Sequence, residues 1–114
     1  LLNKECDLLL PDVCRAGGIS ETLRIAQLAD VFGVSWASHV STSTAVHLMA
    51  GLHVGAATPN CFISECPSGF AHGPFGNCLL KEPLVFENGH ITLNEKPGLG
   101  IELDEEAVAQ LVLL

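Results

Sequence analysis

The pattern of apolar and polar positions in residues 8–40 predicts a strand, a helix and a second strand. Residues 8–10 are three successive leucines, which is typical of a strand buried on both faces. Residues 20–32 repeat apolar side chains at helical spacing, and residues 34–37 form a second short apolar run. Because strands joined through a helix usually pair in parallel, we expect both strands to end at the same edge of one sheet.

The expected helix has start and stop signals of its own. Ser20 is a good N-cap residue, and Ile19 before it can pack back onto the first turns. Gly33 supplies the left-handed position that ends a helix, and the pair Gly17-Gly18 lets the chain turn sharply beforehand. The apolar stripe of this helix should consist of Ile25, Leu28, Ala29 and Phe32.

The following segment repeats the order of helix and strand. Residues 41–57 are a second helix candidate, and residues 58–60 stop it. Residues 61–64 are a third short strand, and residues 66–80 are an irregular loop rich in glycine and proline. The apolar face of the second helix should comprise Val46, Met49, Ala50 and His53.

The C-terminal part of the chain is predicted from turn and cap signals. Asn88-Gly89 stands between two apolar arms, which predicts a β-hairpin over residues 84–93. Asp104 is then expected to cap a last helix over residues 105–113.

One ionisable residue follows each expected strand. Asp12 follows the first, His39 the second and Glu65 the third. An imidazole can take and return a proton near neutral pH, and a neighbouring carboxylate can fix its tautomer and favour the imidazolium. A polar pair at the rim, a turn-capping aspartate or an acid that ends a strand would give the same pattern. Residue order by itself leaves these alternatives open.

Charge and cysteine content exclude several classes of partner. The 114 residues carry a net charge of −8 with five lysines and arginines, so nucleic acid and anionic membranes are not expected partners. Residues 31–64 contain no charged Asp, Glu, Lys or Arg, but histidines and hydroxyl residues interrupt them, so no membrane span is expected. Five cysteines without a C-x-x-C pair are typical of reduced thiols in a cytosolic protein, and their spacing predicts no zinc site.

Four short motifs follow one another along the chain. They are PDVCRAGG at residues 11–18, ASHV at residues 37–40, ISE at residues 63–65 and PGLG at residues 97–100. Together they resemble the C-terminal part of the enolase superfamily, and within it the mandelate racemase/muconate lactonizing enzyme family.

The resemblance implies an α/β fold, namely the C-terminal half of a TIM-type (β/α)₇β barrel followed by a β-hairpin and a C-terminal helix. Residues 1–80 would belong to the barrel, and residues 81–114 would return towards a capping domain that is absent here. A complete barrel needs about 250 residues, so we interpret the chain as part of a longer enzyme. Residues 1–7 are accordingly interpreted as the end of a helix and its exit turn.

The resemblance also implies roles for individual residues. The family's Asp–His dyad falls on Asp12 and His39, and Glu65 matches a glutamate that hydrogen-bonds the substrate carboxylate or the enolate. To donate such a bond, Glu65 would have to be protonated, with a raised pKa. Arg15 is a weak candidate for substrate contact, although a surface position beside a glutamate is favoured, and His72 in the rim loop is a second weak candidate.

The activity implied is abstraction of the proton next to a carboxylate by a Mg²⁺-dependent enzyme. In the family the metal ligands and a second, lysine base lie on strands before this chain, so no metal ligand is expected here. An acid-sugar dehydratase is favoured, a racemase, epimerase or cycloisomerase is the alternative, and a non-catalytic truncated piece is the rival of another class. The full-length enzyme would be a cytoplasmic homo-oligomer acting on a small carboxylate such as a sugar acid, and this chain alone would be inactive. No role is assigned to the remaining histidines and cysteines, His47, His53, Cys14 and Cys66 among them.

Overall fold

A computed structural model describes residues 5–111 of the chain. The expected helix end at residues 1–7 lies partly outside this range, and residues 5–7 are not helical. No helix among the described residues is long and apolar enough to cross a bilayer.

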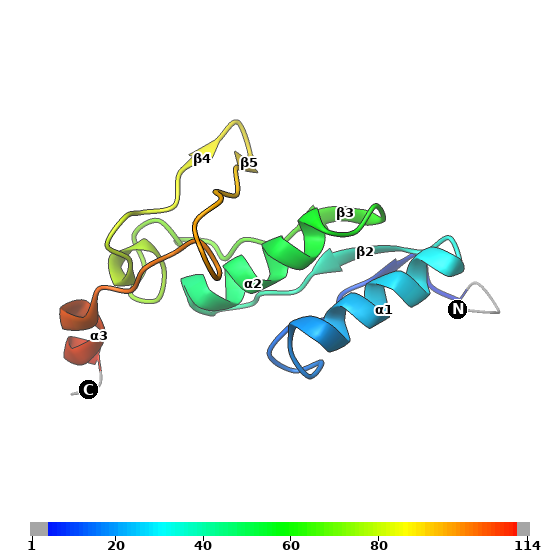
Figure 1. Cartoon of the computed structure of the whole chain (residues 1–114), viewed down its shortest axis with the longest axis horizontal. Coiled ribbons are helices and arrows are strands. Elements are labelled where there is room, and N and C mark those ends of the chain that lie inside the picture. The colour runs from blue at the N-terminus through cyan, green and yellow to red at the C-terminus, as the bar shows by residue number, and fades with distance from the viewer. Residues whose placement is uncertain (1–4, 112–114) are drawn as a thin grey trace.

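The first two thirds of the chain alternate strands and helices. The elements are β1 (Leu8–Leu9), α1 (Ile19–Val31), β2 (Ser35–Ser38), α2 (Ala45–Ala56) and β3 (Cys61–Ser64). The strands form one parallel sheet in the order β1-β2-β3, so each strand lies beside its successor. Both helices lie on the same face of this sheet (Figure 1). The predicted parallel α/β arrangement is therefore confirmed.

Hydrogen bonds inside the core tie the consecutive units together. Trp36 in β2 is completely buried, and its indole N–H donates to the hydroxyl of Thr58, 3.0 Å away. The side-chain amide of Asn60 donates to the carbonyls of Ala26 at 2.9 Å and Val34 at 3.0 Å. One side chain before β3 thus links α1 to the segment that enters β2.

Helix α2 packs on β2 at a position where only glycine fits. A Cβ atom added to Gly51 would lie 2.1 Å from the hydroxyl oxygen of Ser38. Residue 51, which as glycine weakens a helix by its conformational freedom, therefore allows the close approach of helix and strand.

The start of α1 differs from the prediction. The helix begins at Ile19, and Gly18, with φ of 95°, occupies the N-cap position without a side-chain hydrogen bond. Ser20 lies inside the first turn, so the expected serine cap and its apolar partner Ile19 are wrong. The end is as predicted, because Gly33 follows the helix with φ of 66°.

The apolar stripe of α1 was also only partly correct. Thr22, Ala26 and Ala29 are the buried residues of the helix, whereas Leu28 is 54% exposed. Small side chains occupy the face against the sheet, Leu23 and Ile25 beside them are half-buried, and Leu28 lies largely exposed. Hydrophobicity alone cannot rank small against large residues on such a face.

Helix α2 is shorter than expected. It begins at Ala45 rather than at residue 41, because Ser41 is left-handed with φ of 52° and the N-cap residue Thr44 is still extended. Met49 and Ala50 are buried as predicted, but Val46 is exposed and His53 is only half-buried.

The last third of the chain is mostly irregular. It contains a 3₁₀ turn, η1 (Asn77–Leu79), a hairpin of β4 (Phe86–Glu87) and β5 (His90–Ile91), and α3 (Glu105–Leu111). The hairpin is antiparallel, as predicted, and projects away from the sheet (Figure 1).

Both predicted turn and cap signals are confirmed. Asn88 and Gly89 have φ of 51° and 78°, which is the paired left-handed geometry of a tight hairpin turn. Asp104 caps α3 by accepting hydrogen bonds from the N–H groups of Glu106 and Ala107. Residues 112 and 113 of the expected helix lie outside the described range, and the division at residue 80 stays a prediction.

Candidate functional site

The three residues predicted at the strand ends lie in a row. Asp12 and His39 form an isolated parallel bridge, and the His39 N–H donates to the Pro11 carbonyl at 3.1 Å. The Glu65 N–H donates to the carbonyl of Ser38 at 3.2 Å. The parallel pairing thus continues beyond the strands, to Asp12 three residues after β1 and to His39 and Glu65 directly after β2 and β3. It sets the three side chains on neighbouring positions of one rim.

The side chains of Asp12 and His39 form a hydrogen-bonded dyad. His39 Nδ1 lies 3.0 Å from Asp12 Oδ2, while Asp12 Oδ1 accepts the backbone N–H groups of Cys14 at 2.8 Å and Arg15 at 3.1 Å. The carboxylate is buried, with 9% of it exposed, and the imidazole is 35% exposed. The backbone N–H groups therefore fix the Asp12 carboxylate in place, while His39 retains access to solvent.

Electrostatics settle the tautomer of the dyad. Burial raises the pKa of Asp12, but the His39 hydrogen bond, the nearby charge of His47 and the two backbone N–H groups together hold it below its ordinary value. An ionised carboxylate can only accept hydrogen bonds, so His39 Nδ1 must carry the hydrogen. A neutral His39 then presents the lone pair of Nε2, which is the arrangement of a general base.

The Glu65 side chain accepts hydrogen bonds from the backbone. Its Oε2 accepts the backbone N–H groups of Val40 at 2.7 Å and Ser41 at 3.2 Å. These two hydrogen bonds lower the pKa of Glu65, and the charge of His39 adds to the effect. The pKa of Glu65 thus lies on the opposite side of its ordinary value from the one that donation of a hydrogen bond would need. As a carboxylate, Glu65 holds the segment that follows His39.

His47 is a residue of the site that sequence reasoning missed. Its Nε2 lies 3.3 Å from Asp12 Oδ1, and its Nδ1 lies 2.8 Å from the hydroxyl of Ser43. The ring is 5% exposed. One signal was available, because the first turn of a helix that follows a strand end lies close to that end.

The two weaker candidates stand apart from the dyad. The Arg15 side chain is 82% exposed, with Nε 3.9 Å from Asp12 Oδ2, which agrees with the favoured surface position. The nearby glutamate, Glu21, pairs with Arg24 instead. His72 is exposed, and the described residues include no contact between it and Asp12 or His39.

Comparison with known proteins identifies the family. Residues 1–107 match the family described as enolase C-terminal domain-like. The chain belongs to this family. The resemblance seen in the four motifs is thereby confirmed, and the α/β fold is that of the enolase C-terminal domain.

Curated relatives of the chain are enzymes of sugar acids and their lactones by name. A D-xylonate dehydratase of Haloferax volcanii is 40% identical over 102 residues, which cover 90% of this chain and 24% of that protein. A D-galactarolactone cycloisomerase of Agrobacterium fabrum is 35% identical over 109 residues, which cover 91% of this chain and 29% of that protein. The chain thus spans about a quarter of the length of the relatives it matches.

Solved structures of the same family superpose on most of the chain. A mandelate racemase/muconate lactonizing enzyme-like protein of Rubrobacter xylanophilus has a TM-score of 0.83 at 35% identity, covering 96% of this chain and 27% of its own. An enolase of alpha proteobacterium BAL199 with bound Mg has a TM-score of 0.75 at 31% identity, covering 92% of this chain and 26% of its own.

Proposed function

We propose that this chain is the C-terminal part of an acid-sugar dehydratase that uses His39 for proton transfer. The observation that carries the proposal is the Asp12–His39 hydrogen bond at a strand-end rim, with Nε2 of His39 directed by its tautomer to act as a base. The dehydratase and cycloisomerase names of the relatives support a lyase or isomerase acting on a small carboxylate.

The chemistry begins at the carbon next to the substrate carboxylate. His39 Nε2 takes the proton from that carbon, or as the imidazolium gives a proton to the leaving β-hydroxyl group. Removal of one proton and one hydroxide as water leaves an enol, which becomes the 2-keto acid. Asp12 stabilises the imidazolium that forms and keeps the ring oriented, as the carboxylate of a catalytic triad does.

Glu65 has a supporting part in this scheme. Its carboxylate holds the N–H groups of Val40 and Ser41, so the backbone after His39 cannot drift. We propose that it also borders the substrate, since the charges of His39 and Asp12 act on it. Donation of a hydrogen bond to the substrate would require a substrate-induced rise in its pKa.

Magnesium, the metal of the family, does not fit the described residues as ligands. Mg²⁺ prefers several oxygen ligands in octahedral geometry. Asp12 gives its oxygens to His39, Cys14 and Arg15, and Glu65 gives one to the backbone. We propose that Mg²⁺ is held by residues on strands before this chain, where it would stabilise negative charge on the substrate carboxylate.

The parent protein is proposed to form a closed barrel in which β1, β2 and β3 are the last three strands. The consecutive parallel order of these strands and their cover of helices on one face fit such a barrel. A cytoplasmic homo-oligomer remains our expectation for the parent protein.

A cycloisomerase is the second candidate. The relative from Agrobacterium fabrum carries that name, and the first step, removal of the proton next to the carboxylate, is common to both activities. The two activities differ in the group that leaves the β-carbon. A dehydratase expels a hydroxyl group as water, whereas a cycloisomerase breaks the bond to a ring oxygen that stays in the same molecule.

The test uses the full-length protein with a panel of sugar acids and their lactones. A dehydratase forms 2-keto-3-deoxy acids, and His39→Asn should lower kcat by about two to four orders of magnitude. Ring opening of a lactone without loss of water would select the cycloisomerase. Wild-type turnover by His39→Asn would overturn the proposal and leave His39 a structural residue.

A further inference from the structure

His47 is a buried titratable residue that has no part in the chemistry proposed above. It lies in the first turn of α2 with 5% of the residue exposed, and its Nε2 is 3.3 Å from Asp12 Oδ1. The dyad uses the other oxygen of the same carboxylate, since Oδ2 lies 3.0 Å from His39 Nδ1. Asp12 thus lies between one partly exposed imidazole and one buried imidazole.

The carboxylate determines which nitrogen of His47 carries a hydrogen. Asp12 is ionised and can only accept hydrogen bonds, so a lone pair on Nε2 at this distance would be repelled by it, and Nε2 must carry the hydrogen. The hydroxyl of Ser43, 2.8 Å from Nδ1, can donate to that nitrogen or accept from it, and so it suits either charge state of the ring. In both states an N–H group of His47 faces Oδ1.

The contact between His47 and Asp12 is electrostatic rather than a directional hydrogen bond. Oδ1 already accepts the backbone N–H groups of Cys14 at 2.8 Å and Arg15 at 3.1 Å, which take up its lone pairs. Nε2 accordingly has no aligned hydrogen-bond partner among the described residues. The attraction is nevertheless little screened, because both side chains are buried.

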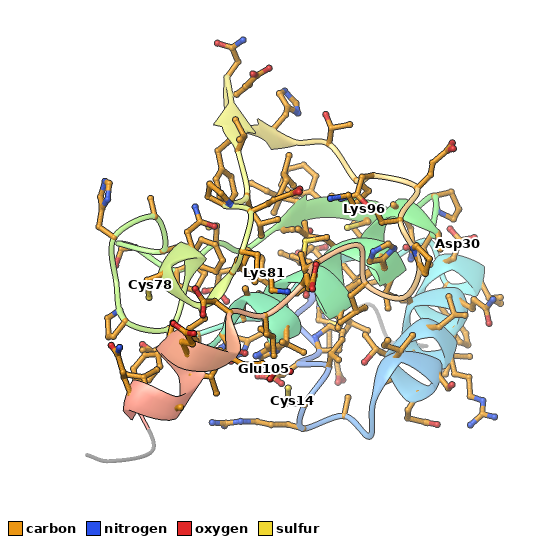
Figure 2. All side chains as sticks on the ribbon, turned by 60° about the vertical axis from the view of Figure 1, so that its left-hand side comes forward. Cys14, Asp30, Cys78, Lys81, Lys96 and Glu105 are labelled. Atoms are coloured by element: carbon orange, nitrogen blue, oxygen red, sulfur yellow. The ribbon has the colours of Figure 1, made fainter. Side chains whose placement is uncertain are left out.

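Other ionisable groups near Asp12 are less well placed to act on its carboxylate. The Arg15 guanidinium is 3.9 Å from Oδ2 but 82% exposed, so solvent and salt screen its charge. Glu65 is bound to the backbone that follows His39. The thiol of Cys14 lies within 4.8 Å of the carboxylate and of His47, at an outer edge of the molecule in the turn before α1 (Figure 2).

We propose that His47 is a positioning residue that limits how strongly Asp12 holds a proton on His39. Asp12 attracts the proton that converts His39 to an imidazolium, and an additional N–H group facing the same carboxylate weakens that attraction. His39 is thereby kept in the neutral form, in which Nε2 can accept a proton from the substrate. The consequence for turnover rests on the function proposed above, whereas the coupling of the three side chains does not.

The test uses the full-length protein at one fixed Mg²⁺ concentration, with variants that remove or keep the N–H group at residue 47. His47→Leu and His47→Met remove it and suit a helix, whereas His47→Gln keeps a neutral N–H donor. His53→Gln is the matched control, because His53 lies on the same helix with its Nε2 3.2 Å from the Leu99 carbonyl oxygen.

The first measurement is the modification of His39 by diethyl pyrocarbonate in the absence of substrate. The reagent acylates neutral imidazole, and mass spectrometry of the His39 peptide gives the rate at each pH. His47→Leu and His47→Met should move the midpoint of this curve upwards by about one pH unit, which is a tenfold change in proton affinity. His47→Gln and His53→Gln should keep the wild-type midpoint, and exposed His90 should keep its own in every variant.

One folded variant without the N–H group is sufficient for this measurement. An unchanged midpoint in such a variant overturns the proposal. An equal shift in His47→Gln also overturns it, because the N–H group would then not be the cause.

The second measurement is the pH dependence of turnover. The acid limb of kcat/KM for His47→Leu or His47→Met should move upwards by the same amount, and activity should return towards that of wild type at alkaline pH. A loss that is equal at every pH would show a purely structural role and overturn the proposal. Failure of wild type to turn over any sugar acid, with the modification curves shifted as expected, overturns the proposed function and leaves the coupling standing.

Discussion

Asp12 divides its carboxylate between two imidazoles. Oδ2 faces His39, and Oδ1 faces His47 and the backbone of Cys14 and Arg15. A buried carboxylate with this many partners cannot reorient without losing several of them at once. Substitution of Asp12 should therefore act mainly through the orientation of His39.

The first prediction concerns this coupling in the full-length protein. Asp12→Asn should lower kcat by about two to four orders of magnitude, because an amide N–H facing Nδ1 selects the wrong tautomer of His39. The losses of Asp12→Asn and His39→Asn should not add in the double variant, since the pair acts as one unit. KM should change less than kcat. Steady-state kinetics on all three variants measure this, and strictly additive losses would show that the two residues act independently.

The second prediction concerns Glu65 and acid stability. Its folded-state pKa lies below the ordinary 4.5, so its stabilising effect is complete above 4.5 and is lost as pH falls through the lower folded value. Glu65→Gln still accepts backbone hydrogen bonds at neutral pH, but it removes this pH dependence.

Urea unfolding between pH ~7 and ~3 should accordingly give a flatter acid limb for Glu65→Gln than for wild type. Glu87→Gln on the hairpin is the matched control and should leave the curve unchanged. Parallel curves for wild type and Glu65→Gln would contradict the role of its carboxylate.

At the scale of elements, the strands and their order were predictable. The apolar runs at residues 8–10, 34–37 and 61–64 match β1, β2 and β3 closely, and Asp12 and His39 met because parallel strands end together. Each run can be recognised from local sequence alone, so the prediction of a strand does not depend on how the helices pack.

The faces of the helices were not predictable, and for His47 the sequence indicates only that it lies early in a helix that follows a strand end. Thr22 and Ala26 are buried because α1 lies close to the sheet. The hydrophobicity of the residues does not indicate the distance between helix and sheet. His47 becomes a neighbour of Asp12 only through the position at which α2 begins, after the extended N-cap residue Thr44. Both features are decided by tertiary contacts rather than by local sequence.

The third prediction tests the contact between α2 and β2. Gly51→Ala places a Cβ 2.1 Å from Ser38 Oγ and should lower the free energy of unfolding by about 1–3 kcal/mol, the usual cost of overpacking. Ser38→Ala should recover much of this loss, since Ser38 Oγ is buried without a hydrogen-bond partner among the described residues.

Gly55→Ala on the same helix serves as control for Gly51→Ala. Its Cβ would meet the sulfur of Cys61 at 3.1 Å and the hydroxyl oxygen of Ser64 at 3.5 Å, much milder contacts than that at residue 51. The gain in helix propensity of about 1 kcal/mol opposes their cost. Urea unfolding of the four proteins measures the set. Equal effects of the two glycine substitutions would show that α2 does not need its close approach at residue 51.

At the scale of the whole molecule, the edge strand β3 has an exposed apolar side chain on each of its faces. Phe62 is 74% exposed and Ile63 is 60% exposed, and successive strand residues point to opposite faces. Val31 at the end of α1 is 79% exposed. Apolar area of this kind normally becomes buried against another surface.

The fourth prediction is that residues 1–114, produced alone, self-associate. Sedimentation velocity should detect oligomers that grow with concentration, because the unpaired edge and apolar faces seek partners. Phe62→Ser with Ile63→Ser should reduce association, whereas Val85→Ser, an equally exposed position in the hairpin segment, should not. A concentration-independent monomer would contradict the prediction.

The row of residues at the strand ends also decides which changes of chain length the molecule tolerates. Asp12, His39 and Glu65 are held next to each other by the distance between adjacent strands, about 4.8 Å, and not by the number of residues between them. Extra residues in the turns at residues 32–33 or 57–59, at the far ends of β2 and β3, would lengthen a spacer and leave the rim as it is. One residue inserted between Ser38 and His39 would instead turn the imidazole to the opposite face of the sheet. Changes of length are therefore tolerated at the N-terminal ends of β2 and β3. At the C-terminal ends, a single added residue would displace the side chains of the site.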